Sequence, residues 1–495
     1  MERLPFELAS MITVDLDVGS VAALRQTSRF NCRQFTPIFL QFFKNQSTDL
    51  TKEGLQRLYR LACSPVLRAA ITTLTLDCLY YHYDLCNYGI HICAPQCPSI
   101  RDPQFPCGCK IRREWIMERQ TEQDLFKGEE MFNMLSFCFE NFSNLRSVNL
   151  EASVVLDVNI KQRPEEVPSM HWRELWTNAI HSYRILILSI AEARICLDSL
   201  SVYQRTRKCS IPTHEVFEPA LFSDIQRANF TSFATSLKTF SISLATTTLP
   251  IRPRQGAPDT SGKRKQLSTY DSFDISRGTN LHADDHRVDS LADLDDVSRL
   301  LHMMPSLESL HIHLCTTVNG ILSPAYYQKF LATLFSHGWH FPMLSHLVLR
   351  GFRTSQDDLY DVLARHVSRL RTLGLENITL STGSWTPMFS LLSRDACLLE
   401  KLRLSALWSP ESHGNRMNLA HAHRVFNSNG LCTPSDNGDA DNVEISWYVW
   451  ELAGEDVRRS GGIQFRPMMG YMGESADSDA TTDWYGQYCA DYGPF

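Results

Sequence analysis

The chain has 495 residues, a formal net charge of −7 and 43% hydrophobic residues, a composition that excludes a disordered, collagen-like or low-complexity protein. Its acidic balance, without a long Lys/Arg block, disfavours a protein that binds nucleic acid. At roughly 100–200 residues per domain, the length allows about two to four domains or one long repeat array.

The sequence has no segment typical of a membrane or secreted protein. Its most apolar run, residues 185–191, is far shorter than the roughly 20 residues that cross a bilayer as a helix. Residues 1–5 include an acidic residue and do not begin an apolar signal-peptide core. We therefore expect a protein of the cytoplasm, the nucleus or both, with no membrane partner.

The first forty residues are predicted to form three short helices. Apolar residues at helical spacing predict the first helix: Leu4, Leu8, Met11 and Ile12. Ser20 and Ser28 are the predicted N-caps of the next two helices. Pro37 is predicted to end the third, because proline cannot donate a backbone hydrogen bond within a helix. So short a segment cannot bury a core by itself, so it must pack against the following domain or a partner.

This segment resembles an F-box. The residues that carry the resemblance are Leu4-Pro5-Phe6-Glu7-Leu8 and Leu24-Arg25-Gln26-Thr27-Ser28-Arg29-Phe30. The turn at residues 17–20 departs from the family because it lacks the commoner proline, and no tryptophan follows the third helix. F-box proteins bind a Skp-type adaptor of a cullin–RING ubiquitin ligase, and the resemblance implies this partner. By position, it implies these adaptor-binding residues: Leu4, Pro5, Leu8, Ile12, Leu24 and Phe30. The alternative is a helical cap on the following domain.

A Leu-x-x-Leu-x-Leu phrase, with conservative replacements, occurs eight times after the first helices. The copies begin at Ile71, Leu145, Leu197, Leu237, Leu307, Leu344, Leu370 and Leu399. Helical patterns precede several of them, and a helix with one short strand cannot bury both faces of that strand alone. We therefore predict an α/β fold in which a leucine-rich-repeat-like solenoid of helices and short parallel strands follows the F-box. This order of segments resembles that of a group of fungal F-box proteins.

Alternation along these strands predicts which side chains face the core. Leu310 and Ile312, like Leu373 and Leu375, are predicted to point inward. The residues between such positions are predicted to line an exposed sheet face that binds an unknown target protein. The predicted target-facing residues are Ser309, His311, His346, Val348, Thr372, Lys401 and Arg403.

Five of the fifteen cysteines lie in a segment of 24 residues. They are Cys86, Cys93, Cys97, Cys107 and Cys109. Zinc takes four thiolate or imidazole ligands in a tetrahedron, but the paired C-x2-C spacing of common zinc sites is absent. Four prolines predict that residues 82–110 form a loop. Three interpretations are open: a zinc site, a disulfide, or reduced structural thiols. No other cofactor is indicated.

Two segments do not fit the repeats. Residues 250–296 are polar and irregular, and we predict a disordered insertion there. Residues 453–495 are predicted to be a flexible acidic tail, after a strand at 443–450 that closes the last repeat. The predicted domains are the F-box at 1–45 and the two parts of the solenoid at 46–249 and 297–452.

The sequence does not contain the common enzyme motifs Gly-x-Ser-x-Gly, Gly-x-Gly-x-x-Gly, the Walker loop or His-Glu-x-x-His. We therefore expect no catalytic residues. The expected function is that of the substrate-recognition subunit of an SCF-type (cullin–RING) E3 ubiquitin ligase. Two alternatives are open: a leucine-rich-repeat scaffold or binding protein without a link to ubiquitination, and a zinc-stabilised interaction module built on the loop at 82–109.

Overall fold

The computed structural model describes most of the first 245 residues and several later segments. The described residues are 6–81, 108–157, 160–164, 167, 172–206, 209–217, 222–245, 292–315, 324–335, 341–392, 398–408 and 450–453. The chain divides into two compact units, the first comprising 1–206 and 222–236 and the second 207–221 and 237–495. Each unit is α/β, with helices between parallel strands, as the sequence predicts at this coarse level.

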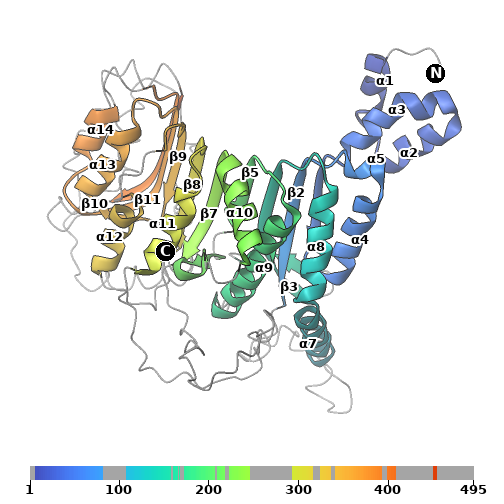
Figure 1. Cartoon of the computed structure of the whole chain (residues 1–495), viewed down its shortest axis with the longest axis horizontal. Helices are drawn as coiled ribbons and strands as arrows, with labels where there is room; N and C mark the ends of the chain where they lie inside the picture. The colour runs from blue at the N-terminus through green and yellow to red at the C-terminus, as the bar shows by residue number, and fades with distance from the viewer. Residues whose placement is uncertain are drawn as a thin grey trace, which may run out of the picture. The chain divides into compact units, whose positions relative to one another are not determined.

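Three helices form the start of the first unit (Figure 1). They are α1 (Phe6–Thr13), α2 (Val18–Thr27) and α3 (Arg29–Gln41). Their shared core is a small cluster of Val21, Phe35 and Ile38, against which Leu16, Leu24 and Phe39 pack half-buried. The predicted number and order of helices are confirmed.

Two predicted boundaries of these helices are wrong. The N-cap of α2 is Asp17, whose carboxylate accepts a hydrogen bond of 2.6 Å from the backbone N–H of Ser20, the predicted cap. Pro37 lies inside α3, which continues to Gln41. Ile38 is buried in the cluster beyond the proline, so continuing the helix gains apolar burial that offsets the lost backbone hydrogen bond.

The sheet of the first unit is built from parallel strands in the order β1-β2-β3-β5, with β4 antiparallel on β3. These strands are β1 (Asn45–Asp49), β2 (Thr73–Tyr81), β3 (Ser147–Asp157), β4 (Ile160–Gln162) and β5 (Ser199–Val202). The helices are α4 (Lys52–Cys63), α5 (Pro65–Arg68), α7 (Gly108–Phe126), α8 (Glu129–Asn141), α9 (Trp172–Ala193) and α10 (Asp224–Ser236). Helices α4, α8 and α9 lie along one face of the sheet, and α7 lies near the carboxyl ends of β2 and β3 (Figure 1).

Within its described residues, the second unit has five parallel strands in the order β7-β8-β9-β11-β12, with β13 antiparallel on β12. They are β7 (Thr239–Ala245), β8 (Ser309–Cys315), β9 (His346–Arg350), β11 (Thr372–Thr382), β12 (Lys401–Trp408) and β13 (Trp450–Ala453). The short strands β6 (Ile211–Pro212) and β10 (Arg353–Ser355) pair with β7 and β11. The helices are η3 (Thr213–Glu215), α11 (Ala292–His302), α12 (Pro324–Phe335), α13 (Gln356–His366) and α14 (Thr386–Leu392).

All eight leucine phrases lie on strands, and each strand begins at the third residue of its phrase. The predicted alternation is confirmed too, since Leu310, Ile312, Leu373 and Leu375 are all buried. The polar strand β1 was not predicted. Strand β13 begins at Trp450, the last residue of the strand predicted at 443–450, and residues 443–449 lie outside the described residues.

Two other predicted segments are only partly within the described residues. Helix α11 begins at Ala292, so the last residues of the predicted insertion at 250–296 are helical; residues 250–291 lie outside the described residues, as do 454–495 of the predicted tail. Helix α7 begins at Gly108, so the last three residues of the predicted loop at 82–110 are helical, and 82–107 lie outside the described residues.

Candidate functional site

Exposed apolar side chains are concentrated on the three N-terminal helices and the turns beside them. We call this set the N-terminal apolar surface: Leu8, Met11, Ile12, Val14, Val18, Phe30 and Phe42. Met11 is 70% and Val14 75% exposed. Because the inward residues of the helices already form their own cluster, these outward apolar residues have no role in that core. So many on one short segment make it a candidate interaction surface.

The predicted adaptor-binding residues are divided by the structure. Leu8, Ile12 and Phe30 belong to the N-terminal apolar surface. Leu24 packs half-buried against the internal cluster, so it supports the helices from within. Leu4 and Pro5 lie outside the described residues.

Four members of this surface were not among the predicted adaptor-binding residues: Met11, Val14, Val18 and Phe42. Val14 and Val18 lie beside the turn between α1 and α2, and Phe42 follows α3. For Val14, Val18 and Phe42 the sequence held a signal: they are apolar residues next to turns, where solvent-exposed polar residues are more common.

The sheet of the first unit has an acidic row on the face opposite the leucines. Asp49, Asp77 and Glu151 are register partners on β1, β2 and β3. Lys161 of β4 contacts the carboxylates of Asp49 and Asp77, each at an Nζ–Oδ distance of 2.6 Å. The hydroxyl of Thr206 donates a hydrogen bond of 3.0 Å to Glu151. Three carboxyl groups with one ammonium group give this row a net negative charge.

Burial changes the protonation behaviour of the acidic row. Burial raises the pKa of Asp77, although the hydrogen bond and charge of Lys161, and a hydrogen bond from Ser153, act in the opposite direction. Burial likewise raises the pKa of Glu151 against the hydrogen bond from Thr206. The polar partners therefore compensate the cost of holding carboxylates in a partly buried place.

Helix α7 limits this polar face. Ile116 of α7 packs in a buried cluster with Leu79 and Tyr81 of β2 and Val155 of β3. Leu79 and Tyr81 follow Asp77 at two-residue spacing, so they lie on the same face of the strand. The face is thus polar along the first part of β2 and apolar where α7 packs on it.

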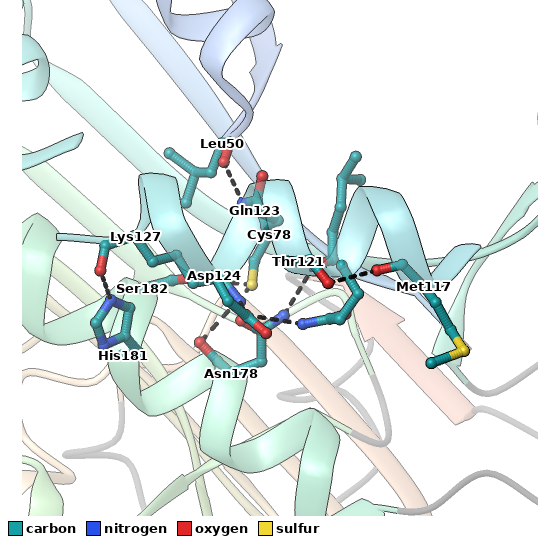
Figure 2. A network of polar contacts seen from close by, with 12 residues as sticks. Leu50, Cys78, Met117, Thr121, Gln123, Asp124, Lys127, Asn178, His181 and Ser182 are labelled. Atoms are coloured by element: carbon teal, nitrogen blue, oxygen red, sulfur yellow. Dashed lines mark hydrogen bonds and ion pairs between the residues drawn. The ribbon is translucent and has the colours of Figure 1, made fainter. Parts of the chain in front are cut away.

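A network of polar contacts holds the end of α7 against its surroundings (Figure 2). The side-chain amide of Gln123 donates to the carbonyl of Leu50 at 2.5 Å. His181 of α9 donates from Nε2 to the carbonyl of Lys127 at 3.0 Å. These two contacts join α7 to the end of β1 and to α9.

Cys78 and Ser182 lie in the same network, with Sγ and Oγ 3.0 Å apart (Figure 2). Burial raises the pKa of the Cys78 thiol, whereas a nucleophilic cysteine needs a lowered pKa. Asn178 donates a hydrogen bond of 2.8 Å to the carbonyl of Leu79. The geometry and burial of these groups fit a structural role between β2 and α9.

The second unit brings all seven predicted target-facing residues onto one face of its sheet. Strand register places them in adjacent rows: Ser309, His346, Thr372 and Lys401 in the first, and His311, Val348, Gly374 and Arg403 in the second. Lys401 and Arg403 are exposed, and the other predicted residues are half-buried. At Gly374, a β-carbon would lie 3.1 Å from both methyl groups of Val348, so the glycine leaves room for that side chain.

A third row follows on the same face and was not predicted. It consists of His313, Arg350, Glu376 and Ser405. Glu376 contacts Arg403 at 3.1 Å and Arg350 at 3.9 Å. This row lies beyond the six residues of each leucine phrase, which is why the phrases do not identify it. We call the cationic and imidazole groups of the three rows the basic face: His311, His313, His346, Arg350, Lys401 and Arg403.

Hydroxyl groups accompany the imidazoles of the basic face. Ser309 Oγ lies 3.3 Å from His311 Nε2, and Ser345 Oγ lies 2.7 Å from His346 Nδ1. Burial, and then the charge of His346, lower the pKa of His311. His311 is therefore a neutral hydrogen-bonding group near neutral pH, whereas Arg350, Lys401 and Arg403 carry positive charge on the face.

The residues that the structure describes contain neither a metal-binding group nor a helix that could span a membrane. Within them, no group of three or more His, Cys, Asp or Glu residues is arranged to hold a metal ion. The side chains of the proposed zinc ligands lie outside the described residues: Cys86, Cys93, Cys97, Cys107 and Cys109. None of the described helices is long and apolar enough to span a bilayer.

Comparison with known proteins does not assign the chain to a family. No protein-family model matches it. No curated protein matches it either.

Proposed function

We propose that this protein is the substrate-recognition subunit of a cullin–RING ubiquitin ligase. Helices α1–α3 bind a Skp-type adaptor, and the exposed sheet faces bind the target. The observation that carries the proposal is the N-terminal apolar surface, with seven large apolar side chains exposed on a segment of about forty residues.

The energetics of this surface support a bound partner. Burying one large apolar side chain stabilises a complex by about 1.5–3 kcal/mol. Phe30 and Leu8, each about half exposed, are among the residues whose positions match the F-box pattern. Their burial in an interface would supply a substantial part of the binding free energy, because fully desolvated aromatic and aliphatic residues dominate most interfaces.

The proposed function requires no chemistry by this chain. Holding an adaptor at one end and a target on a sheet raises the local concentration of the target near the ligase. The three-row face of the second unit supports this role, since it presents hydroxyl, imidazole, amine and guanidinium groups on a parallel sheet.

Adaptor binding is tested with the double variant Leu8→Asp/Phe30→Asp in the full chain. We expect recovery of a Skp-type adaptor in co-purification to fall at least about tenfold, because two charges would be buried in the interface. The matched control is Leu125→Asp, which places the same charge at an 83% exposed apolar residue of α7. Circular dichroism and thermal unfolding check that each variant is folded.

Two outcomes would contradict the proposal. Equal adaptor recovery by the double variant and the control would exclude the N-terminal apolar surface as the binding site. Failure of the unmodified chain to bind any Skp-type adaptor would favour the alternative of a repeat scaffold or binding protein without a link to ubiquitination.

A further inference from the structure

The exposed sheet faces of the two units have opposite charge. The acidic row of the first unit combines Asp49, Asp77 and Glu151 with Lys161. Among the side chains that the structure describes, the basic face of the second unit combines Arg350, Lys401 and Arg403 with the carboxylate of Glu376. An anionic segment is therefore attracted by the second face and repelled by the first.

The C-terminal end of the sequence is anionic. From Pro467 to the C-terminus it has five acidic residues and no Lys or Arg. The acidic residues are Glu474, Asp477, Asp479, Asp483 and Asp491. They account for most of the net charge of −7 of the whole chain.

The chain leaves the described part of the second unit beside the basic face. Strand β13 pairs with β12 so that Glu451 is the register partner of Arg403 and Ala453, its last residue, that of Lys401. About twenty residues separate Ala453 from Glu474, and an extended chain of that length reaches up to about 70 Å. The face from β8 to β12 spans three strand spacings, or about 15 Å, so every row is within reach.

We propose that the acidic C-terminal segment, residues 467–495, binds the basic face of the second unit in the same molecule. Tethering gives the segment an effective concentration on the order of 1 mM at the face, so a weak contact is enough for substantial occupancy. The occupied face is closed to other anionic segments. A target must then compete with the chain's own C-terminus. This contact does not depend on adaptor binding.

The test uses a fluorescently labelled synthetic peptide of residues 467–495 and the full-length protein. The key variant neutralises the segment in place: Glu474→Gln, Asp477→Asn, Asp479→Asn, Asp483→Asn and Asp491→Asn. We expect the peptide to bind this neutralised chain at least about tenfold more tightly than the unmodified chain, because the tethered competitor is weakened. Equal affinity for the two chains would overturn the proposal.

The location of the contact is tested by charge reversal in the neutralised chain. We expect Arg403→Glu to weaken peptide binding at least about fivefold, since a cation becomes an anion in the middle row of the face. The control is Arg299→Glu, which makes the same charge change on helix α11, at a side chain 60% exposed. Equal weakening by the two substitutions would refute the basic face as the site. Arg403→Gln provides the milder variant if reversal beside Glu376 unfolds the protein.

Carbodiimide coupling distinguishes the tethered segment from that of a second copy. In the unmodified chain we expect Lys401 to couple to a carboxylate within 474–491, with a yield that does not change on dilution. A yield that rises with protein concentration would show that a second molecule supplies the segment, which would overturn the intramolecular contact.

Discussion

His181 shows how burial fixes the state of one side chain. It is 7% exposed, and its Nε2 donates to the carbonyl of Lys127. Burial, reinforced by the charge of Lys127, lowers its pKa to about 4. The imidazole is therefore neutral in the folded protein near neutral pH, and its proton lies on the nitrogen that faces the carbonyl.

Stability should fall below pH 6.5 because of this histidine. His181 takes up a proton near pH 6.5 in the unfolded chain but only near pH 4 in the folded chain. Its contribution to the free energy of unfolding is therefore complete above pH 6.5 and is lost as the pH falls from 6.5 toward 4. The loss is about 1.4 kcal/mol per pH unit for a single group. Urea unfolding at pH 7 and pH 5 measures it, with His181→Gln for comparison. The same pH dependence in both proteins would contradict the assignment to His181.

At the scale of single elements, local hydrogen bonds decide where the N-terminal helices begin. Ser28 Oγ accepts a hydrogen bond of 3.1 Å from the backbone N–H of Asn31 and caps α3. Ser20 has the same type of side chain but lies inside the first turn of α2, where its own N–H is bound by Asp17. The two serines therefore differ only in their place relative to the helix start.

Substitution of these serines should have unequal effects. We expect Ser28→Ala to destabilise α3 by about 1 kcal/mol, because an orphan backbone N–H loses its acceptor. Ser20→Ala should leave the helices as stable as before or slightly more stable, since alanine is the better helix former. Hydrogen–deuterium exchange of the amides in α2 and α3 reports both effects. Faster exchange in Ser20→Ala than in Ser28→Ala would contradict the cap assignment.

Strand elements were predicted well where their side chains carried the pattern. The leucine phrases identify eight strands because the buried face of each strand needs large apolar residues at two-residue spacing. Strand β1, Asn-Gln-Ser-Thr-Asp, has no such pattern, and it is a strand because its backbone pairs with β2 at the sheet edge. Backbone pairing with a neighbour leaves little trace in a polar sequence.

At the scale of the whole molecule, charge and apolar surface are separated along the chain. The N-terminal apolar surface lies on α1–α3 and the turns beside them, whereas the basic face lies on β8, β9 and β12. An apolar interface and a charged one differ in their response to salt, because salt screens exposed charges and leaves apolar burial largely intact.

Salt should therefore separate the two proposed interactions. Raising NaCl from about 0.05 M to about 0.5 M should lower the affinity of peptide 467–495 for the neutralised chain at least about tenfold. The same change should alter the affinity of the protein for the adaptor by less than about threefold. Fluorescence anisotropy measures the first affinity and surface plasmon resonance the second. A parallel loss of both affinities would contradict this division of roles.

The sequence by itself determined the α/β class, the eight main strands and the side of each strand that faces the core. These properties depend on local periodicity, which neighbouring residues encode directly. The tertiary structure decided which polar residues share a face. Lys161 forms an ion pair with Asp49, which lies 112 residues earlier in the chain. Glu376 of β11 contacts Arg350 of β9 and Arg403 of β12. Such contacts depend on strand register and on the path of the chain between strands, which a single sequence does not specify.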